Sequence, residues 1–378
     1  MLNSSFWRRL SLTAVLLSSL IASDGAQCQD AAAAQSDTGP PPKQLFRCVE
    51  SKDHVIVYCG RSEVLRYNIA APKAPEGIDP TYQRSGYIHP IYSPAGRMVS
   101  GDFAADHPHQ HGLFAAWTDT SFRGKKVDFW NQLKQLGVVL HDRVIAVGDE
   151  GESTEFSVAV RHSAIDDQGV REAILDDVWT VSVTGVNTGV SGGVSGGNDS
   201  GEDQKPARYL IQFSTEQTNI TEHPLTINEY HYGGIGFRGN NAWFSGPSAK
   251  ALAAFVKQPQ ADAPPLELTR HRFLTSEGHD RRLGNHSRPE WAALFGIVDQ
   301  TQGQNHIAGV RVTPSPLNER YPDPVRLHPT KPYFSISPCV VGAFDIGPGQ
   351  TYRARYDFEV FDGMPSFDEA VVEDGFAR

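Results

Sequence analysis

Short segments in which apolar and polar residues alternate recur along the chain, and this pattern constrains the fold more than any other feature. The alternation runs through residues 54–58, 156–162, 178–183, 209–213, 306–312, 333–337 and 352–361. Successive side chains of a β-strand point to opposite faces, so a period of two indicates strands with one buried face. The sequence therefore predicts a fold built from many short strands.

The connections between these segments favour antiparallel sheets. The chain contains 35 glycines and 25 prolines, which suit frequent turns better than long helices. Strands joined by turns, without regular intervening helices, are typical of sandwiches. One late helix is predicted where Ser366 and Glu369 form a capping box. We expect an all-β fold, an antiparallel β-sandwich with peripheral short helices.

The first 44 residues precede the predicted sandwich. Arg8 and Arg9 are followed by an apolar run, 10–22, which is too short to span a bilayer but typical of a signal peptide. We expect a signal peptide over 1–26, a flexible linker over 27–44, and export to the periplasm or the extracellular space; an uncleaved anchor is the alternative. No later run approaches about 18 apolar residues, so no membrane span is expected in the mature chain.

A Gly- and Ser-rich run interrupts the strand pattern. Residues 189–197 read GVSGGVSGG, within a segment, 185–204, of Gly, Ser, Asn and acidic residues. Because strand candidates of similar character flank it, we interpret it as a loop inserted into a single sandwich domain, 45–378. A domain boundary is the rival interpretation.

Charge and cysteine content limit the partners and the cross-links of the chain. With 44 acidic and 34 basic residues the formal net charge is -10, which gives no electrostatic footprint for nucleic acid. Export would permit disulfides, and a turn at 51–53 could bring Cys48 and Cys59 together in a hairpin. The four cysteines allow three pairings, and none has the spacing of a structural zinc site.

Polar and aromatic side chains concentrate around three histidines, His107, His109 and His111. On an extended strand all three would face one way, but Pro108 favours a loop that enters a strand. Any one of them could simply bond to neighbouring backbone groups. The density of the whole cluster instead favours a functional cleft.

The cluster supports two kinds of site. In a sugar site, His111, His109 and Asp102 would transfer protons. In a metal site, His107, His109 and His111 would hold a divalent ion with Asp102 or Asp106. Residues expected to bind a sugar, the tryptophans by stacking and the arginines through directional donors, are His89, Trp117, Trp130, Arg238, Arg288 and Trp291.

The run RSGYIHPIYSPAGRMVSGDFAADHPHQHGLFAAW, residues 84–117, resembles the signature of a bacterial family of exported proteins labelled methane oxygenase PmoA-like. Gln110 departs from that family's commonest pattern of adjacent histidines. Weaker matches at 128–130, 232–238, 288–291 and 362–363 extend the resemblance over most of the mature chain. Taken literally, the label implies a metal-dependent oxidoreductase.

A shorter run, QHGLFAAW, residues 110–117, is similar to a motif of galactose-mutarotase-like aldose epimerases. This similarity implies an antiparallel β-supersandwich and a role for His111 in the sugar pocket and its acid–base chemistry. His223 and Glu229 are candidates for that family's second histidine and late glutamate.

We therefore expect an exported carbohydrate-active enzyme of the PmoA-like family. It would use His, Asp and Glu side chains for acid–base chemistry on a carbohydrate or other small polar substrate, with no required cofactor. Epimerase, hydrolase and lyase activities all remain open. The alternatives are a metal-dependent oxidoreductase or hydrolase with a divalent ion, and a non-catalytic glycan-binding module.

Overall fold

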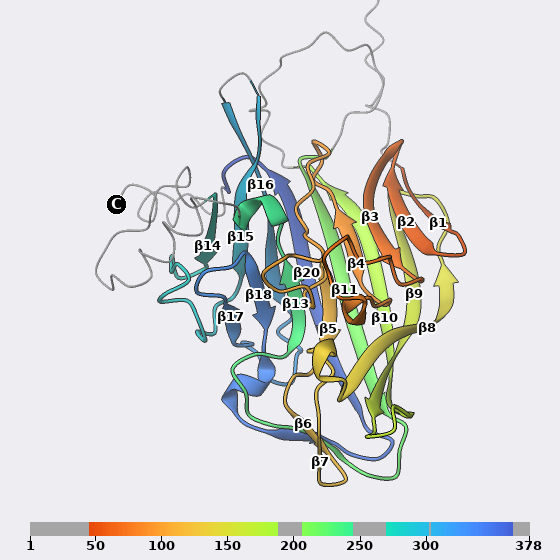
Figure 1. The fold of residues 1–378 in the computed structure, drawn as a ribbon. Helices are drawn as coiled ribbons and strands as arrows, with labels where there is room; N and C mark the ends of the chain where they lie inside the picture. The colour runs from red at the N-terminus through yellow and green to blue at the C-terminus, as the bar shows by residue number, and fades with distance from the viewer. Residues whose placement is uncertain (1–44, 188–205, 245–269, 302–303, 366–378) are drawn as a thin grey trace, which may run out of the picture. The chain divides into compact units, whose positions relative to one another are not determined.

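The computed structural model describes residues 45–187, 206–244, 270–301 and 304–365, and in these ranges the chain is almost entirely β-structure (Figure 1). The strands form three sheets in which every pairing is antiparallel. Helical structure in the same ranges is limited to short 3-10 turns at Pro80–Tyr82, Gln132–Lys134, Asn241–Phe244 and Pro338–Val341.

The first sheet has eight strands, and its last four carry the functional site described below. In spatial order they are β1 (Phe46–Glu50), β2 (His54–Cys59), β3 (Ser62–Asn68), β4 (Ile88–Ile91), β5 (Leu113–Ala116), β13 (Gly234–Arg238), β18 (Tyr333–Ile336) and β17 (Val325–Leu327). Strands β13, β17 and β18 join β5 from more than a hundred residues away in the sequence.

The second sheet also has eight strands, and the third has four. The second runs β14 (His271–Thr275), β15 (Ala292–Thr301), β16 (Gln304–Pro314), β20 (Thr351–Asp362), β11 (Arg208–Asn219), β10 (Arg171–Val186), β9 (Ser153–Ile165) and β8 (Gly137–Val147). The third runs β19 (Phe344–Ile346), β12 (Leu225–Ile227), β6 (Thr120–Phe122) and β7 (Lys125–Val127). The seven segments with period-two alternation all lie in strands, as predicted.

The two large sheets pack face to face. Tyr67 of the first sheet meets Trp179 of the second with ring centroids 6.1 Å apart, and Phe46 meets Tyr209 at 6.0 Å. All four side chains are buried and belong to one hydrophobic cluster that contains residues of both sheets. This confirms the predicted all-β antiparallel sandwich.

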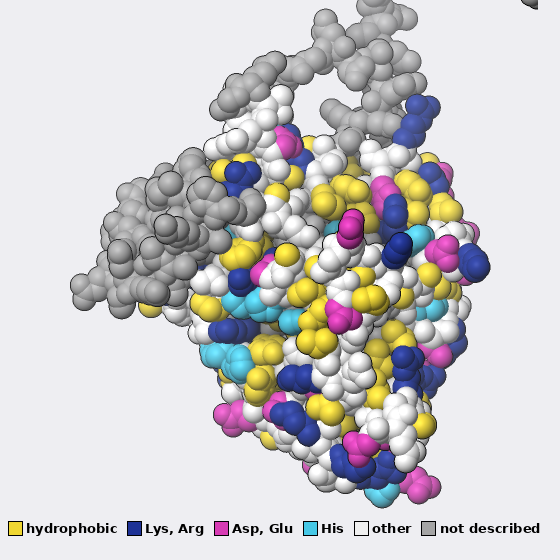
Figure 2. Space-filling view, in the orientation of Figure 1, with side chains coloured by type: hydrophobic (Ala, Val, Ile, Leu, Met, Phe, Trp, Pro, Cys, Tyr) yellow, Lys and Arg dark blue, Asp and Glu magenta, His cyan; other side chains and the backbone are white. Residues whose placement is uncertain are grey.

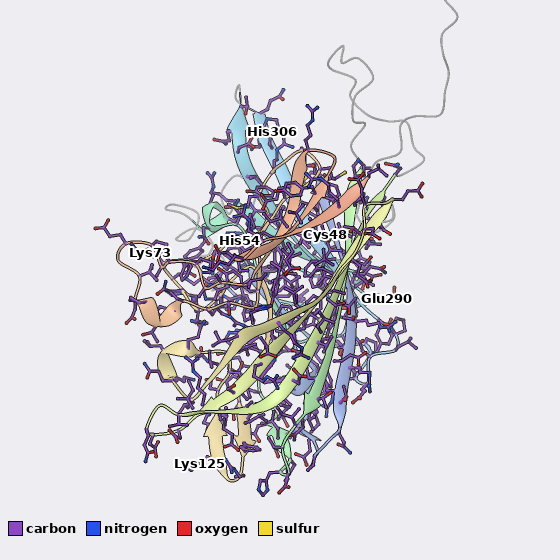
Figure 3. All side chains as sticks on the ribbon, turned by 90° about the vertical axis from the view of Figure 1, so that its right-hand side faces the viewer. Cys48, His54, Lys73, Lys125, Glu290 and His306 are labelled. Atoms are coloured by element: carbon purple, nitrogen blue, oxygen red, sulfur yellow. The ribbon has the colours of Figure 1, made fainter. Side chains whose placement is uncertain are left out.

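The two cysteines expected to meet do lie on one hairpin, but they are not cross-strand neighbours. Strands β1 and β2 pair so that Cys48 faces Val57 and Cys59 faces Phe46. The Cys48 thiol instead donates to the carbonyl oxygen of Glu155 on β9, at 3.7 Å (Figure 3). The structure therefore contains the hairpin without a disulfide between these two residues.

The strands that flank the Gly- and Ser-rich run are paired neighbours, since Val186 of β10 lies opposite Arg208 of β11. This is the arrangement expected of a hairpin. The predicted signal peptide (1–26), linker (27–44), most of the 185–204 insertion and the late helix at Ser366 lie outside the described residues. In the described ranges no helix has the length and apolar character needed to cross a membrane.

Candidate functional site

The histidine-rich segment is an irregular loop, 101–112, that leads into β5. His107, His109 and His111 therefore do not share one face of a strand. His111 is fully buried, whereas His107 and His109 line a cavity. The loop predicted from Pro108 is present, and its irregular backbone separates the three imidazoles into two groups.

The first group, which we call the Asp102–His111 cluster, consists of Tyr87, His89, Ser100, Asp102 and His111. His111 Nδ1 and Asp102 Oδ1 are 2.5 Å apart, and the Tyr87 hydroxyl donates to Asp102 Oδ2 at 2.7 Å. His89 Nδ1 bonds to the Ser100 hydroxyl at 2.8 Å. Because residues 102 and 111 stand at opposite ends of the loop, their contact closes it at its base.

The charges in this cluster are set by burial and by the short contact. Burial lowers the pKa of His111, although Asp102 acts in the opposite direction. Burial alone would raise the pKa of Asp102, but its hydrogen bond and attraction to His111 bring that pKa below the usual value. The arrangement is that of a carboxylate fixing the ring of a histidine that has no exposed surface.

A second anchor holds the middle of the loop. The Arg238 guanidinium, fully buried at the end of β13, donates to Asp106 Oδ1 at 2.9 Å and to Gln110 Oε1 at 3.0 Å. Against the effect of burial, the hydrogen bond from His107, followed by the hydrogen bonds and the charge of Arg238, brings the pKa of Asp106 well below the usual range. Arg238 was predicted to bind substrate, but its nitrogens are directed to the loop itself. Gln110, the departure from the PmoA-like pattern, is one of the two acceptors.

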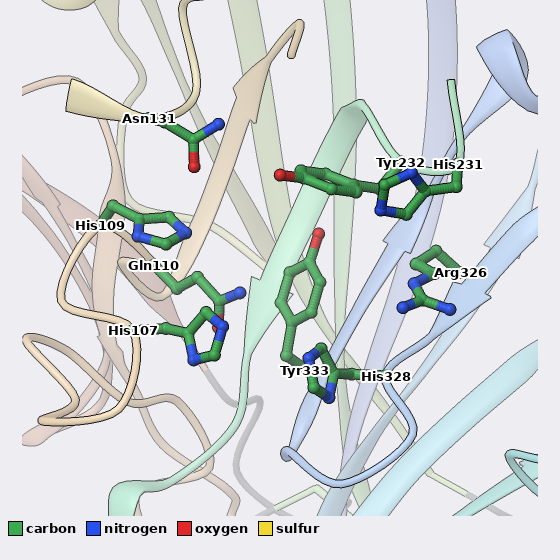
Figure 4. Close-up of a pocket in the computed structure, with 9 residues that line it drawn as sticks. All are labelled: His107, His109, Gln110, Asn131, His231, Tyr232, Arg326, His328 and Tyr333. Atoms are coloured by element: carbon green, nitrogen blue, oxygen red, sulfur yellow. The ribbon is translucent and has the colours of Figure 1, made fainter. Parts of the chain in front are cut away.

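The second group of histidines lines a cavity of about 260 Å³, which we call the histidine pocket (Figure 4). Its walls come from the loop before β5, the turn after Trp130, the residues before β13, and strands β17 and β18. The lining residues are His107, His109, Gln110, Asn131, His231, Tyr232, Arg326, His328 and Tyr333. Figure 2 shows histidine side chains, with lysine or arginine beside them, gathered on this face of the molecule over β17 and β18.

The pocket lies on the face of the first sheet that points away from the core. Arg238 pairs with Tyr333, and Arg326 with Ser335, so these residues share one face. Their neighbours along the strands, Leu327 among them, are buried in the hydrophobic cluster between the sheets. Because successive side chains of a strand point to opposite faces, the same strands place apolar side chains in the core and polar side chains in the pocket.

His107 and His328 carry opposite hydrogen-bonding roles at Nε2. His107 Nδ1 lies 3.1 Å from Asp106 Oδ2, so its Nδ1 carries a hydrogen and the neutral ring leaves Nε2 as an acceptor. His328 Nδ1 accepts from the backbone amides of Thr330, at 3.1 Å, and Lys331, at 3.0 Å. Its neutral ring therefore carries hydrogen on Nε2 and donates there. The two rings meet edge to face, with centroids 5.5 Å apart.

The pocket keeps His109 and His328 neutral and its two phenols protonated. Burial, followed by the charges of His107 and Arg326, lowers the pKa of His328 to about 2. Burial and the neighbouring histidines lower the pKa of His109 to about 3. Burial raises the pKa of Tyr232 to about 12 and that of Tyr333 well above its ordinary value. At neutral pH these four side chains are uncharged.

These shifts predict that the protein loses stability on mild acidification. In the unfolded chain His109 and His328 titrate near pH 6.5, whereas in the folded protein they resist protonation down to about pH 3 and about pH 2. Below about pH 6.5 the unfolded state therefore binds more protons, and the free energy of unfolding falls by about 1.4 kcal/mol per pH unit for each histidine. The free energies of unfolding measured with urea at pH 7 and pH 5 should therefore differ by about 4 kcal/mol.

A double variant, His109→Gln with His328→Gln, serves as the control, because it should weaken this dependence and leave only the part that other buried histidines such as His111 and His89 contribute. Carboxylates titrate below this window and do not mask the effect. Equal stability at pH 7 and pH 5 would show that the two imidazoles are not protected from protons.

The two tryptophans predicted to stack on sugars lie in the core. Trp117 is 1% exposed and donates through Nε1 to Gln217 Oε1 at 2.6 Å. Trp130 is fully buried, with its ring against Tyr232 at 5.4 Å and Tyr333 at 6.0 Å. Trp117 reaches the second sheet through Gln217, whereas the ring of Trp130 is covered by Phe114 and by the two tyrosines, so neither exposes a face to a ligand. Trp130 instead supports the two tyrosines of the pocket from behind.

Three further predicted residues are separate from the pocket. Glu229 is exposed and is not among the lining residues. Arg288 donates to the carbonyl oxygens of Pro322, at 2.6 Å, and Arg320, at 3.0 Å. Trp291 packs on a small hydrophobic cluster of β14, β15 and β20. The pocket therefore brings His107, His109 and Gln110 together with residues from other parts of the chain. Glu229, Arg288 and Trp291 are not among them.

The three histidines suggested as metal ligands do not converge on one point. His111 is fully buried and bonds to Asp102, and it is not among the residues that line the cavity with His107 and His109. Among the described residues, no group of three or more His, Cys, Asp or Glu side chains is arranged to hold a metal ion. His328, which is close to His107, presents a protonated Nε2 in its neutral form and so offers no lone pair there.

The sequence analysis missed several residues of the pocket. The alternation of polar and apolar residues at 325–328 could have identified two of them, Arg326 and His328. Arg326 and His328 alternate with buried Val325 and Leu327, so Arg326 is on the polar face of β17 and His328 follows its last residue. Tyr333 begins the alternating segment 333–337, whereas Asn131 and Tyr232 carry no such signal. Asp128, part of the sequence cluster, explains Asn131: it accepts from the Asn131 amide nitrogen at 2.8 Å and is fully buried.

Two solved structures are similar to the chain at low identity. The galactosidase domain of the α-galactosidase–sucrose kinase AgaSK is 7% identical, with a TM-score of 0.30, over 85% of this chain and 41% of the other. The Slr1438 protein from Synechocystis sp. PCC 6803 is 11% identical, with a TM-score of 0.30, over 85% of this chain and 97% of the other. The chain thus spans less than half of the first structure. Likeness at this level carries no argument about function.

No curated protein matches the sequence. A family match does extend over residues 54–374, from β2 to beyond β20, and so includes both anchors of the loop and every residue of the histidine pocket. The family is described only as one of unknown function, so the match decides neither the oxygenase expectation nor the epimerase expectation. The chain belongs to the family of unknown function DUF6807.

Proposed function

We propose that the protein binds a small polyhydroxylated molecule, a sugar or a close relative, in the histidine pocket and transforms it by acid–base chemistry. The observation that carries this proposal is the contact between the rings of His107 and His328 beside one cavity. In their neutral forms Nε2 of His107 accepts a hydrogen bond, whereas Nε2 of His328 donates one. A proton acceptor and a donor placed together are what a proton transfer between two oxygens of a substrate requires.

The size and the polarity of the cavity support a small, hydroxyl-rich ligand. Its volume of about 260 Å³ lies just below the range of roughly 300–1,000 Å³ usual for small-molecule sites. Figure 4 shows the hydroxyls of Tyr232 and Tyr333 directed into the space that His109 and Asn131 border. Phenols, imidazoles and amides both donate and accept, which matches the alternating donors and acceptors of a sugar ring.

The roles follow from the hydrogen bonds. His107 is the proton carrier: its Nε2 takes a proton from a substrate hydroxyl, and the imidazolium returns it to another substrate oxygen. Asp106 fixes the ring through Nδ1 and stabilises the imidazolium. His328 stays neutral and stabilises developing negative charge on oxygen by donating from Nε2. This scheme uses only the protein's own side chains.

A screen of the exported form tests the proposal. Purified protein without residues 1–26 would be mixed with aldoses in D₂O and followed by NMR for anomer interconversion, bond cleavage or exchange of carbon-bound hydrogen. We expect one of these to proceed measurably faster than the buffer rate for at least one sugar. Binding without any turnover would favour the glycan-binding module, and the absence of both would reject the proposal.

Export and the PmoA-like activity are separate proposals. The run after Arg8 and Arg9 supports a signal peptide, and amino-terminal sequencing of the secreted protein would reveal the cleavage. The methane-oxygenase activity rests on the resemblance of residues 84–117, and metal analysis of the purified protein tests it. A stoichiometric metal ion lost in His109→Ala would favour that alternative.

A further inference from the structure

We propose that the ligand of the histidine pocket is a sugar acid, a monosaccharide-sized molecule whose carboxylate pairs with Arg326. The inference rests on the proposed function, because it specifies which class of small polyhydroxylated molecule enters the same pocket. It derives from the distribution of charge around the cavity.

Arg326 is a cation in the pocket wall without a carboxylate partner. It lies in β17, and its guanidinium donates through one terminal nitrogen to Asn285 Oδ1 at 3.0 Å. Asn285 Oδ1 also accepts from the backbone amide of Leu327, so it fixes Arg326 to its own strand. Within the part of the chain that the structure describes, no Asp or Glu forms an ion pair with Arg326.

The carboxylates next to the pocket, Asp106 and Asp128, already form ion pairs with basic side chains other than Arg326. Asp106, which contacts His107, pairs with Arg238 at 2.9 Å and with Lys331 at 3.5 Å. Asp128, which holds Asn131, pairs with Lys134 at 2.8 Å. Among the described lining residues there is no Asp or Glu at all.

A further cation reinforces the excess of positive charge. Arg281 is 5% exposed, donates to the carbonyl oxygen of His328 at 3.1 Å, and leaves its second terminal nitrogen without a hydrogen-bond partner. After burial, the charge of Arg326 contributes to the lowered pKa of both His231 and His328. The field of these guanidiniums therefore reaches the cavity, in a protein whose formal net charge is -10.

A carboxylate is the anion that fits one guanidinium. Arginine binds carboxylates with two parallel hydrogen bonds, and such charge-assisted pairs are the strong ones. A phosphate dianion would need a second cation or a set of backbone amides in the lining, and Arg326 is the only Arg or Lys among the described lining residues. With the carboxylate at Arg326, the hydroxyls of the sugar ring would form hydrogen bonds with polar side chains of the pocket such as Tyr333 and His107.

Matched sugars provide the test, because glucuronate and glucose, or galacturonate and galactose, differ only at C6. By calorimetry at neutral pH we expect the uronate to bind about 10- to 100-fold more tightly than its parent hexose. In Arg326→Gln the affinity for the uronate should fall to that for the hexose, while the hexose affinity stays within about twofold. Arg326→Lys keeps the charge but loses the paired hydrogen bonds, so it should be intermediate.

Controls separate this inference from the proposed function. Arg353→Gln alters an arginine of β20 that pairs with Glu216 outside the pocket, so it should leave both affinities unchanged. Equal affinities for hexose and uronate, or equal losses of both in Arg326→Gln, would overturn the sugar-acid assignment and leave the proposed function standing. Tighter binding of a hexose phosphate than of the uronate would also overturn it. If neither kind of sugar binds, the proposed function fails as well.

Discussion

His107→Gln is expected to lower the turnover of a sugar substrate by about 10²- to 10⁴-fold, the usual cost of removing a general acid–base group. Glutamine keeps a polar side chain of similar reach but cannot take up a proton near neutral pH. The fold should be retained, since His107 is only partly buried in a loop anchored by other residues. Initial rates at one pH, with melting temperatures measured in parallel, would check the expectation.

Two further variants sharpen this test. Asp106→Asn can still bond to Nδ1 of His107 but removes the negative charge beside the ring, so turnover should fall, though by less than in His107→Gln. His54→Gln alters a histidine of β2, outside the pocket (Figure 3), and should leave turnover unchanged. Unaltered turnover in His107→Gln would contradict the assigned proton carrier.

His111→Ala is expected to lower the free energy of unfolding by about 3–5 kcal/mol, the usual cost of removing one partner of a buried charged pair. The imidazole is fully buried, and its loss leaves Asp102 Oδ1 with only the amide of Phe103 while opening a void beneath the loop. The sequence analysis predicted a catalytic role for His111, but its burial indicates that it positions the loop. Guanidinium unfolding curves at pH 7 would measure the loss.

His111→Gln is the comparison for this prediction, because it retains most of the volume and can still bond to Asp102. We expect it to recover at least half of the lost stability. Ligand affinity should fall together with stability in both variants, since His107 and His109 lose their fixed positions. A stable His111→Ala protein with strongly reduced turnover would instead restore the catalytic interpretation.

The features that could be predicted from the sequence are those determined by nearby residues. Strand alternation is local, so the strands and the sandwich were recognised. The loop at Pro108 was recognised for the same reason. The closeness of His107 and His109 to one cavity also agrees with their closeness along the chain, whereas Asp102 contacts His111 instead.

The features that could not be predicted depend on which strands become neighbours. Arg326 and Tyr333 meet the loop only because β18 pairs with β13 and with β17, and no local pattern encodes that order. The tryptophans were misinterpreted for a related reason. Trp117 and Trp130 stand beside polar residues in the sequence, but whether an aromatic face is open is decided by packing partners far along the chain, such as Gln217 and Tyr333.

The anchoring of the 101–112 loop from its buried side has a consequence for how proteins of this family could diverge. The contacts that fix the loop, between Asp102 and His111 and between Arg238 and Asp106, lie beneath it, whereas Arg326, His231 and Asn131 reach the cavity from other segments. Under the proposed function, substitution of Arg326, His231 or Asn131 would change the contacts to the ligand without removing the contacts that hold the loop in place. Single substitutions at these wall residues would therefore change ligand preference, while His107 and His109 keep their positions in the anchored loop.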